Sequence, residues 1–183
     1  MERLVVWRGI GDWRAEAAYV RIEDGRLSAQ GTQLGAEPEP YRLDYSLRTG
    51  PDYVTDTLEL SLLRGAALRR LLLARGADGT WTADNRPLPE VEGALDCDLG
   101  LCPLTNTMPV LRHRLLDERA EPRDLVMAWV AVPELTVHRS EQRYEPVDAS
   151  HVRYVDASFA AELEYDDDGL VLNYPKLADR VTS

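Results

Sequence analysis

The chain has 183 residues, 44% of them hydrophobic, which is enough for one domain with a substantial core. Its 32 acidic and 21 basic residues give a formal charge of −11. Nucleic acids and anionic membrane surfaces need clustered Lys and Arg, so this balance argues against both as partners. No stretch approaches the ~18 apolar residues of a membrane span, and the first residues do not resemble a signal peptide. We therefore expect a single cytoplasmic domain over residues 1–183, without integral membrane association.

Hydrophobic and polar residues alternate through the first half of the chain. Residues 17–23 put Ala18, Val20 and Ile22 on one face. Residues 41–47 and 54–62 repeat the pattern, with inward positions at Tyr41, Leu43, Tyr45, Leu47, Leu58, Leu60 and Leu62. Such alternation is typical of antiparallel strands with one buried face. Turn signals such as Asp24-Gly25 and Asp78-Gly79 separate the runs and predict about six strands between residues 3 and 83.

The pattern stops between residues 86 and 124. This stretch is rich in turn-forming residues and has no regular period. Residues 109–116 can form two turns of helix, with Thr107 near the cap and Pro109 in the first turn. We expect a long ordered loop with one short helix here. A loop of this length inside a compact domain is usually functional.

Both cysteines, Cys97 and Cys102, lie in this loop. A Cys-x4-Cys pair without a second pair is a poor zinc site, and it is not the Cys-x-x-Cys of redox proteins. We expect both thiols to be reduced and buried, and no metal or cofactor to be bound. Two catalytic patterns stay open: Cys102 as a nucleophile with His113, or paired carboxylates at Asp96 and Asp98. Neither spacing is specific.

Alternation returns between residues 125 and 176, where four or five more strands are predicted. The clearest runs are residues 159–165 and 170–174, joined by the turn Asp167-Asp168-Gly169. One short helix cannot cover ten or so one-sided strands, so the sheet must fold over as a sandwich or curl into a full or partial barrel. The inward residues are mostly Leu, Val and Ala, and the chain has a single Phe. This shortage of bulk favours a partly open, apolar-lined cavity, although a filled sandwich fits the pattern equally well.

Two polar groups stand out against this apolar background. Thr105-Asn106-Thr107 is flanked by Leu104 and Met108 and either faces a cavity mouth or braces its own loop. Gln142 and Tyr144 share one strand face. A few polar groups on an apolar pocket are typical of ligand sites.

Four segments in order, residues 95–112, 126–137, 142–147 and 167–181, resemble the bacterial glycolipid-binding family. The most specific matches are Cys97-Asp98, the run from Pro103 to Pro109, and the closing Gly169, Tyr174-Pro175 and Arg180. The resemblance implies a mainly β fold, a large curled antiparallel sheet that forms a half-barrel or open barrel. One or two short helices would cover its concave face, in a shape similar to periplasmic lipoprotein carriers. It also implies an apolar concavity suited to an acyl chain.

Together these features predict a non-catalytic carrier or binding protein, monomeric or homodimeric, for an amphipathic lipid or glycolipid. The expected ligand-binding residues are Thr105, Asn106, Thr107, Arg112, Gln142, Tyr144, Tyr174 and Arg180. One alternative is a hydrolase or isomerase that uses Cys102 or an aspartate of 96–98 in the same cavity. Another is a protein-interaction module that pairs through an exposed sheet edge.

Overall fold

A computed structural model describes residues 1–181, which form one curled sheet of 15 strands around a short helix. The strands of the first half are β1 (Glu2–Gly9), β2 (Arg14–Glu23), β3 (Arg26–Gly35), β4 (Tyr41–Thr49), β5 (Thr55–Arg64), β6 (Ala67–Arg75), β7 (Trp81–Ala83) and β8 (Arg86–Pro87). Those of the second half are β9 (Asp96–Leu99), β10 (Arg123–Val130), β11 (Val137–Pro146), β12 (His151–Val155), β13 (Ala160–Tyr165), β14 (Val171–Tyr174) and β15 (Ala178–Arg180). The helices are η1 (Pro51–Tyr53), η2 (Pro89–Val91), η3 (Pro103–Asn106) and α1 (Thr107–His113), the first three being 3-10 turns.

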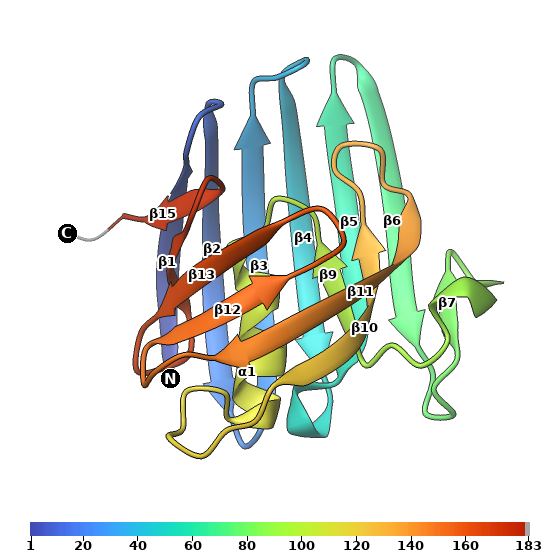
Figure 1. The fold of residues 1–183 in the computed structure, drawn as a ribbon. Coiled ribbons are helices and arrows are strands. Elements are labelled where there is room, and N and C mark those ends of the chain that lie inside the picture. Colours follow the sequence, from blue (N-terminus) through green and yellow to red (C-terminus); the bar gives the residue numbers. More distant parts are fainter. Residues whose placement is uncertain (182–183) are drawn as a thin grey trace.

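The strand order shows how the two halves join. It runs β8-β7-β6-β5-β4-β3-β2-β1-β15-β14-β13-β12-β11-β10-β9, and its two ends do not pair, so the barrel is open. Residue Trp7 of β1 lies opposite Arg180 of β15, which joins the start of the described chain to its end. All neighbours are antiparallel except β9 and β10. Strands β10–β13 cross in front of β2–β6 (Figure 1), which confirms the predicted half-barrel.

The predicted alternation produces the concave face of the first half. Register places Leu47 opposite Leu58 and Leu58 opposite Leu73, and all three side chains are at most 1% exposed. Cross-strand pairs of this kind stabilise a sheet because their side chains contact directly. A glycine shapes the same face. A Cβ at Gly31 would lie 2.3 Å from the Tyr45 ring, so the missing side chain lets that ring lie flat on β3.

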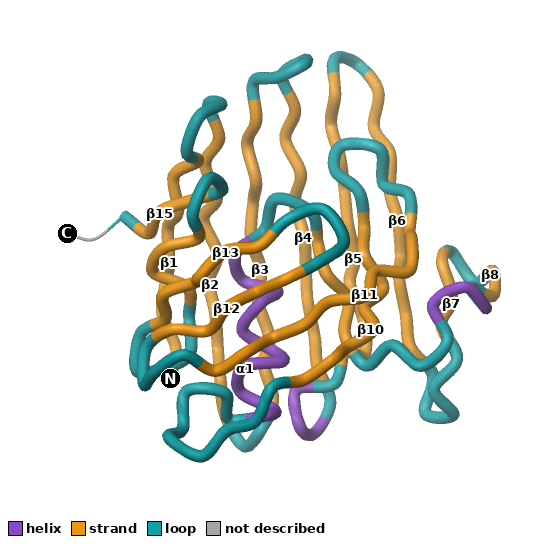
Figure 2. The backbone as a smooth tube through the Cα atoms, viewed as in Figure 1, coloured by secondary structure: helices purple, strands orange, loops and turns teal. Residues whose placement is uncertain are grey.

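The concave face is filled by the chain itself. Residues 88–116, here called the inner segment, begin beside β7 and β8 and continue between the two halves of the sheet, where α1 lies (Figure 2). Leu99, Leu104 and Met108 from this segment are at most 1% exposed and belong to the same core cluster as Leu43 and Leu60. The helical cover predicted from sequence is therefore present. Among residues 1–181, the inner segment packs against this core cluster and supplies the bulk that the strand residues lack, so it covers the concave side that was expected to be partly open.

A second core cluster lies between β10–β14 and α1. Its larger members are the tyrosines of four strands, packed against the helix and the turn after it: Tyr144, Tyr154, Tyr165, Tyr174, Val110 and Leu115. The rings of Tyr144 and Tyr154 meet edge to face with centroids 5.5 Å apart, a favourable geometry for aromatic pairs. None of the described helices is long and apolar enough to cross a membrane.

Candidate functional site

A buried polar network is centred on Asp98 of β9. Alternation along this short strand sends Asp98 to one face and Cys97 and Leu99 to the other, where they join the core. Asp98 Oδ2 accepts a hydrogen bond from Gln142 Nε2 at 2.7 Å, and Oδ1 accepts one from Thr105 Oγ1 at 2.9 Å. Burial raises the pKa of Asp98, and these two donors offset part of that rise.

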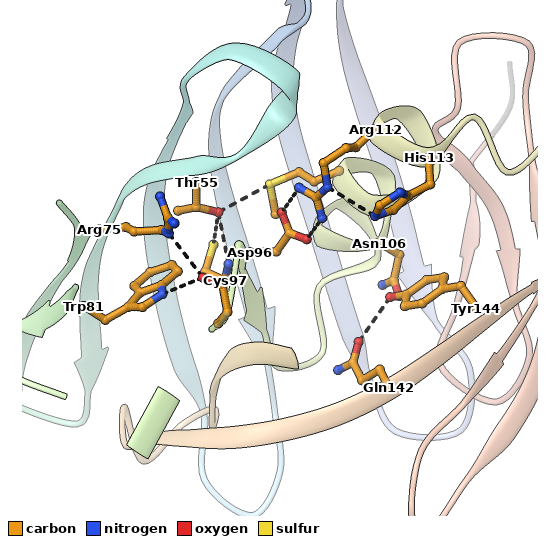
Figure 3. A network of polar contacts seen from close by, with 12 residues as sticks. Thr55, Arg75, Trp81, Asp96, Cys97, Asn106, Arg112, His113, Gln142 and Tyr144 are labelled. Atoms are coloured by element: carbon orange, nitrogen blue, oxygen red, sulfur yellow. Dashed lines mark hydrogen bonds and ion pairs between the residues drawn. The ribbon is translucent and has the colours of Figure 1, made fainter. Parts of the chain in front are cut away.

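The hydroxyl of Tyr144, on β11, joins the network to Asn106 of the inner segment. The Tyr144 hydroxyl donates to Asn106 Oδ1 at 2.9 Å and lies 3.2 Å from Gln142 Oε1 (Figure 3). Asn106 Nδ2 donates to the Pro103 carbonyl at 3.3 Å. Four of the predicted site residues, Thr105, Asn106, Gln142 and Tyr144, thus meet around Asp98. Their side chains are at most 4% exposed, so they do not stand at an open cavity mouth and Asn106 braces its own loop.

An ion pair lies beside this network. The guanidinium of Arg112, from α1, holds both oxygens of Asp96, with Nη1 to Oδ1 at 2.7 Å and Nη2 to Oδ2 (Figure 3). The two side chains are 8% and 1% exposed. Burial raises the pKa of Asp96, and the guanidinium opposes that rise. Next to the pair, the Cys97 amide donates to Thr55 Oγ1 at 3.0 Å and so joins β9 to the start of β5.

The remaining predicted site residues lie outside the network. Thr107 is fully buried at the start of α1, and its hydroxyl has no hydrogen-bond partner among residues 1–181. Tyr174 belongs to the aromatic cluster, with its ring centroid 6.1 Å from that of Tyr154. Arg180, on β15, donates a hydrogen bond from Nη1 to Asp166 Oδ2 at 2.5 Å. The structure therefore does not bring Arg180 together with the other predicted residues.

A third buried carboxyl, that of Glu16, was missed from the sequence. Glu16 Oε1 accepts hydrogen bonds from the Tyr45 hydroxyl at 2.7 Å and the Cys102 thiol at 3.1 Å. Gln33 Nε2 donates to Glu16 Oε2 at 3.2 Å and lies 3.4 Å from the Gly100 carbonyl. Glu16 is 4% exposed, and burial raises its pKa to about 7. The alternation of inward and outward residues could have identified it, because Glu16 lies two residues before the inward-facing Ala18.

A small hollow adjoins this carboxyl. Its volume is about 20 Å³, and its lining includes Glu16, Gln33, Tyr41 and Pro103. That space holds about one water molecule. Gln33 Oε1 is buried and has no hydrogen-bond partner among the described residues.

The two thiols have the environment of inert cysteines. Burial raises the pKa of Cys97 to about 12 and raises that of Cys102 well above its usual value. Both are free and buried, as predicted. Because the thiolate is the reactive form, neither is a ready nucleophile at neutral pH. Cys102 donates to Glu16, whereas the described side-chain contact of His113 is with Arg112, so the two do not form a hydrogen-bonded pair.

Comparison with known proteins shows the family of the chain. Residues 4–180 match the model of a family described as "Putative glycolipid-binding". The chain belongs to this family. A crystal structure of a DUF1089 family protein from Pseudomonas aeruginosa superposes with a TM-score of 0.78 at 30% identity, covering 96% of this chain and 95% of that one. No curated protein matches the chain.

Proposed function

We propose that this protein is a non-catalytic binding protein for an amphipathic lipid or glycolipid. In this proposal the acyl chain of the ligand occupies the concave face of β1–β7, and the inner segment moves aside to admit it. The observation that carries the proposal is the nature of the cover. A continuous apolar face made of long strands is covered by a segment whose regular structure is two 3-10 turns, a four-residue strand and one helix of seven residues.

Burial of an acyl chain and burial of four apolar side chains of the inner segment contribute free energies of similar size. Val91, Leu99, Leu104 and Met108 are buried against the concave face. Their burial stabilises the closed form by about 6–12 kcal/mol at ~1.5–3 kcal/mol per side chain. An acyl chain of about 16 carbons contributes about 12 kcal/mol at ~0.8 kcal/mol per buried CH2. A long acyl chain therefore offsets the burial of these four side chains, whereas a short one does not.

The polar network provides contacts for a headgroup. Displacing the inner segment separates Asp98 from Gln142 and Asn106 from Tyr144, and this exposes the Gln142 amide and the Tyr144 hydroxyl. Sugar hydroxyls both donate and accept hydrogen bonds, as these groups require. The buried, protonated thiols support a binding role over catalysis by cysteine.

A reversible crosslink tests whether the inner segment must move. Thr55 Oγ1 lies 3.5 Å from Cys97 Sγ, so the Thr55→Cys variant places two thiols within reach of a disulfide that ties β9 to β5. Binding of dodecyl maltoside is measured by native mass spectrometry for the oxidised and the reduced forms of this variant. Thr55→Ser is the matched control, because it keeps the hydroxyl that Cys97 contacts.

We expect the reduced variant and the serine control to bind the glycolipid analogue, and the oxidised form to bind at least about tenfold more weakly. The loss must reverse on reduction. Equal binding by the oxidised form would refute entry between the two halves of the sheet. No binding by any form, with dodecyl maltoside or with longer alkyl glycosides, would refute the proposed ligand class.

A further inference from the structure

Within residues 1–181, strand β6 has an outer edge that is unpaired over its first five residues. Strand β7 pairs only with the last three residues of β6, from Leu73 to Arg75. The turn after β7 adds one more contact, because Leu72 donates to Asp84 Oδ1 at 2.9 Å and accepts from the Asp84 amide at 2.8 Å. Figure 1 shows β7 beside only the lower end of β6. Residues 67–71 therefore form a free flank.

The free backbone groups on this flank can be identified. In an antiparallel ladder, successive residues direct their N–H and C=O groups to opposite sides. Leu72 directs its groups away from β5 toward Asp84, so Leu68 and Arg70 do the same. No hydrogen bond within residues 1–181 engages these groups of Leu68 and Arg70. The β6 edge, defined here as residues 67–72, thus offers two residues with four free backbone groups.

The opposite end of the sheet has no such flank. There, Cys97 of β9 donates its amide to Thr55 Oγ1 at 3.0 Å, and the Thr55 amide donates to the Leu95 carbonyl at 3.0 Å. The edge of β9 is therefore closed by β5. An exposed strand edge can pair with another chain. The side chains of the β6 edge therefore decide which kind of chain would pair there.

The side chains of the β6 edge are basic and apolar in an acidic protein. Arg69 and Arg70 are exposed, project to opposite faces and form no ion pair within residues 1–181, although the chain carries a net charge of −11. Leu68 and Leu72 are 54% and 36% exposed on the same face as Arg70. A second copy is a poor occupant. Two-fold antiparallel pairing centred on the middle of this edge, at residue 69 or 70, puts Arg69 opposite Arg69 or Arg70 opposite Arg70, and like charges directly opposite are destabilising.

We propose that the β6 edge binds an extended acidic segment of a partner protein as an added strand. The partner's backbone pairs with Leu68 and Arg70, consecutive acidic side chains lie beside Arg69 and Arg70, and apolar side chains cover Leu68 and Leu72. The inference does not rest on the acyl-binding proposal, because Leu68, Arg70 and Leu72 project to the face opposite Leu71 and the core.

Fluorescence anisotropy with a labelled peptide tests this. The probe is Val-Val-Glu-Glu-Val-Thr with blocked ends, and the comparison peptide has Lys-Lys in the centre. Arg70→Pro removes an edge-facing N–H and spares the ladder to β5, while Arg70→Ala removes the side chain alone. The double variant Arg69→Glu/Arg70→Glu reverses the charge. Its control is Arg26→Glu/Arg48→Glu, an equal change in net charge on exposed positions of β3 and β4.

We expect saturable binding of the acidic peptide and none of the basic one. The double charge reversal on the edge weakens binding by at least about tenfold, and the control pair has a much smaller effect. Arg70→Pro weakens binding about fivefold more than Arg70→Ala does. Equal binding of both peptides, or equal loss in the control variant, would overturn the proposal. So would a concentration-dependent dimer, seen by ultracentrifugation, that Arg70→Pro abolishes.

Discussion

Replacing Glu16 by Gln tests the buried carboxyl that links the sheet to the inner segment. The folded state raises the pKa of Glu16 from 4.5 to about 7 because the carboxyl is desolvated. The folded protein therefore holds this proton more tightly than the unfolded chain does between pH 4.5 and 7. Over that window the free energy of unfolding falls as the pH rises, by about 3 kcal/mol from this group alone. Below pH 4.5 the carboxyl is protonated in both states and the cost of burying its charge is absent, and above pH 7 that cost is constant.

Glu16→Gln keeps an acceptor for the Tyr45 hydroxyl but cannot ionise. We expect it to flatten the pH dependence and to be more stable than the wild type at pH 8, with little advantage at pH 4.5. The assay is urea unfolding followed by tryptophan fluorescence at half-unit steps between pH 4.5 and 8. Glu90→Gln, at an exposed position, controls for the change in net charge. If the free energy of unfolding of the Glu16 variant falls with pH as steeply as that of the wild type, the Glu16 carboxyl is not desolvated as described here.

Three further outcomes follow from the core and the network. Asp96→Asn leaves the Arg112 charge buried without its counter-ion and should lower the free energy of unfolding by about 3–5 kcal/mol, measured by urea unfolding; a loss below ~1 kcal/mol contradicts the buried pair. Gly31→Ala forces the Tyr45 ring off β3 and should cost about 1–3 kcal/mol, and a Tyr45→Ala background should relieve most of that cost. Cys97 and Cys102 should resist a thiol reagent at pH 8 until urea unfolds the protein; fast labelling of folded protein contradicts their burial.

The strands of the first half were predictable because one residue period decides both their type and their buried face. Leu43, Leu58 and Leu62 lie inward as expected. Strand β9 was not predictable in this way. Its sequence Asp96-Cys97-Asp98-Leu99 places two acids on one face of a strand that pairs in parallel with β10. Arg112 and Thr105 of the inner segment and Gln142 of β11 bond to these acids, and no local pattern encodes those contacts.

The helix and the cavity show the limits of local patterns. The helix was predicted over 109–116 but α1 is Thr107–His113, because Arg114 takes a left-handed conformation with φ of +51° and ends it. The inner segment was recognised as unusual, yet its place inside the half-barrel depends on contacts such as Met108 against the core, which no local period encodes. Glu16 escaped notice because the alternation was followed only from Ala18 onward.

The most direct test of the central proposal asks where an acyl chain lies. Trp7 and Trp81 are 1% and 2% exposed in the cluster that lines the concave face. Replacing Trp13 and Trp129 by Phe leaves these two as the only tryptophans of the chain. A dodecyl maltoside analogue brominated at the end of its alkyl chain should quench their fluorescence, and the oxidised Thr55→Cys crosslink should abolish that quenching. Binding without quenching, or quenching that persists in the crosslinked form, would place the ligand elsewhere and contradict the account.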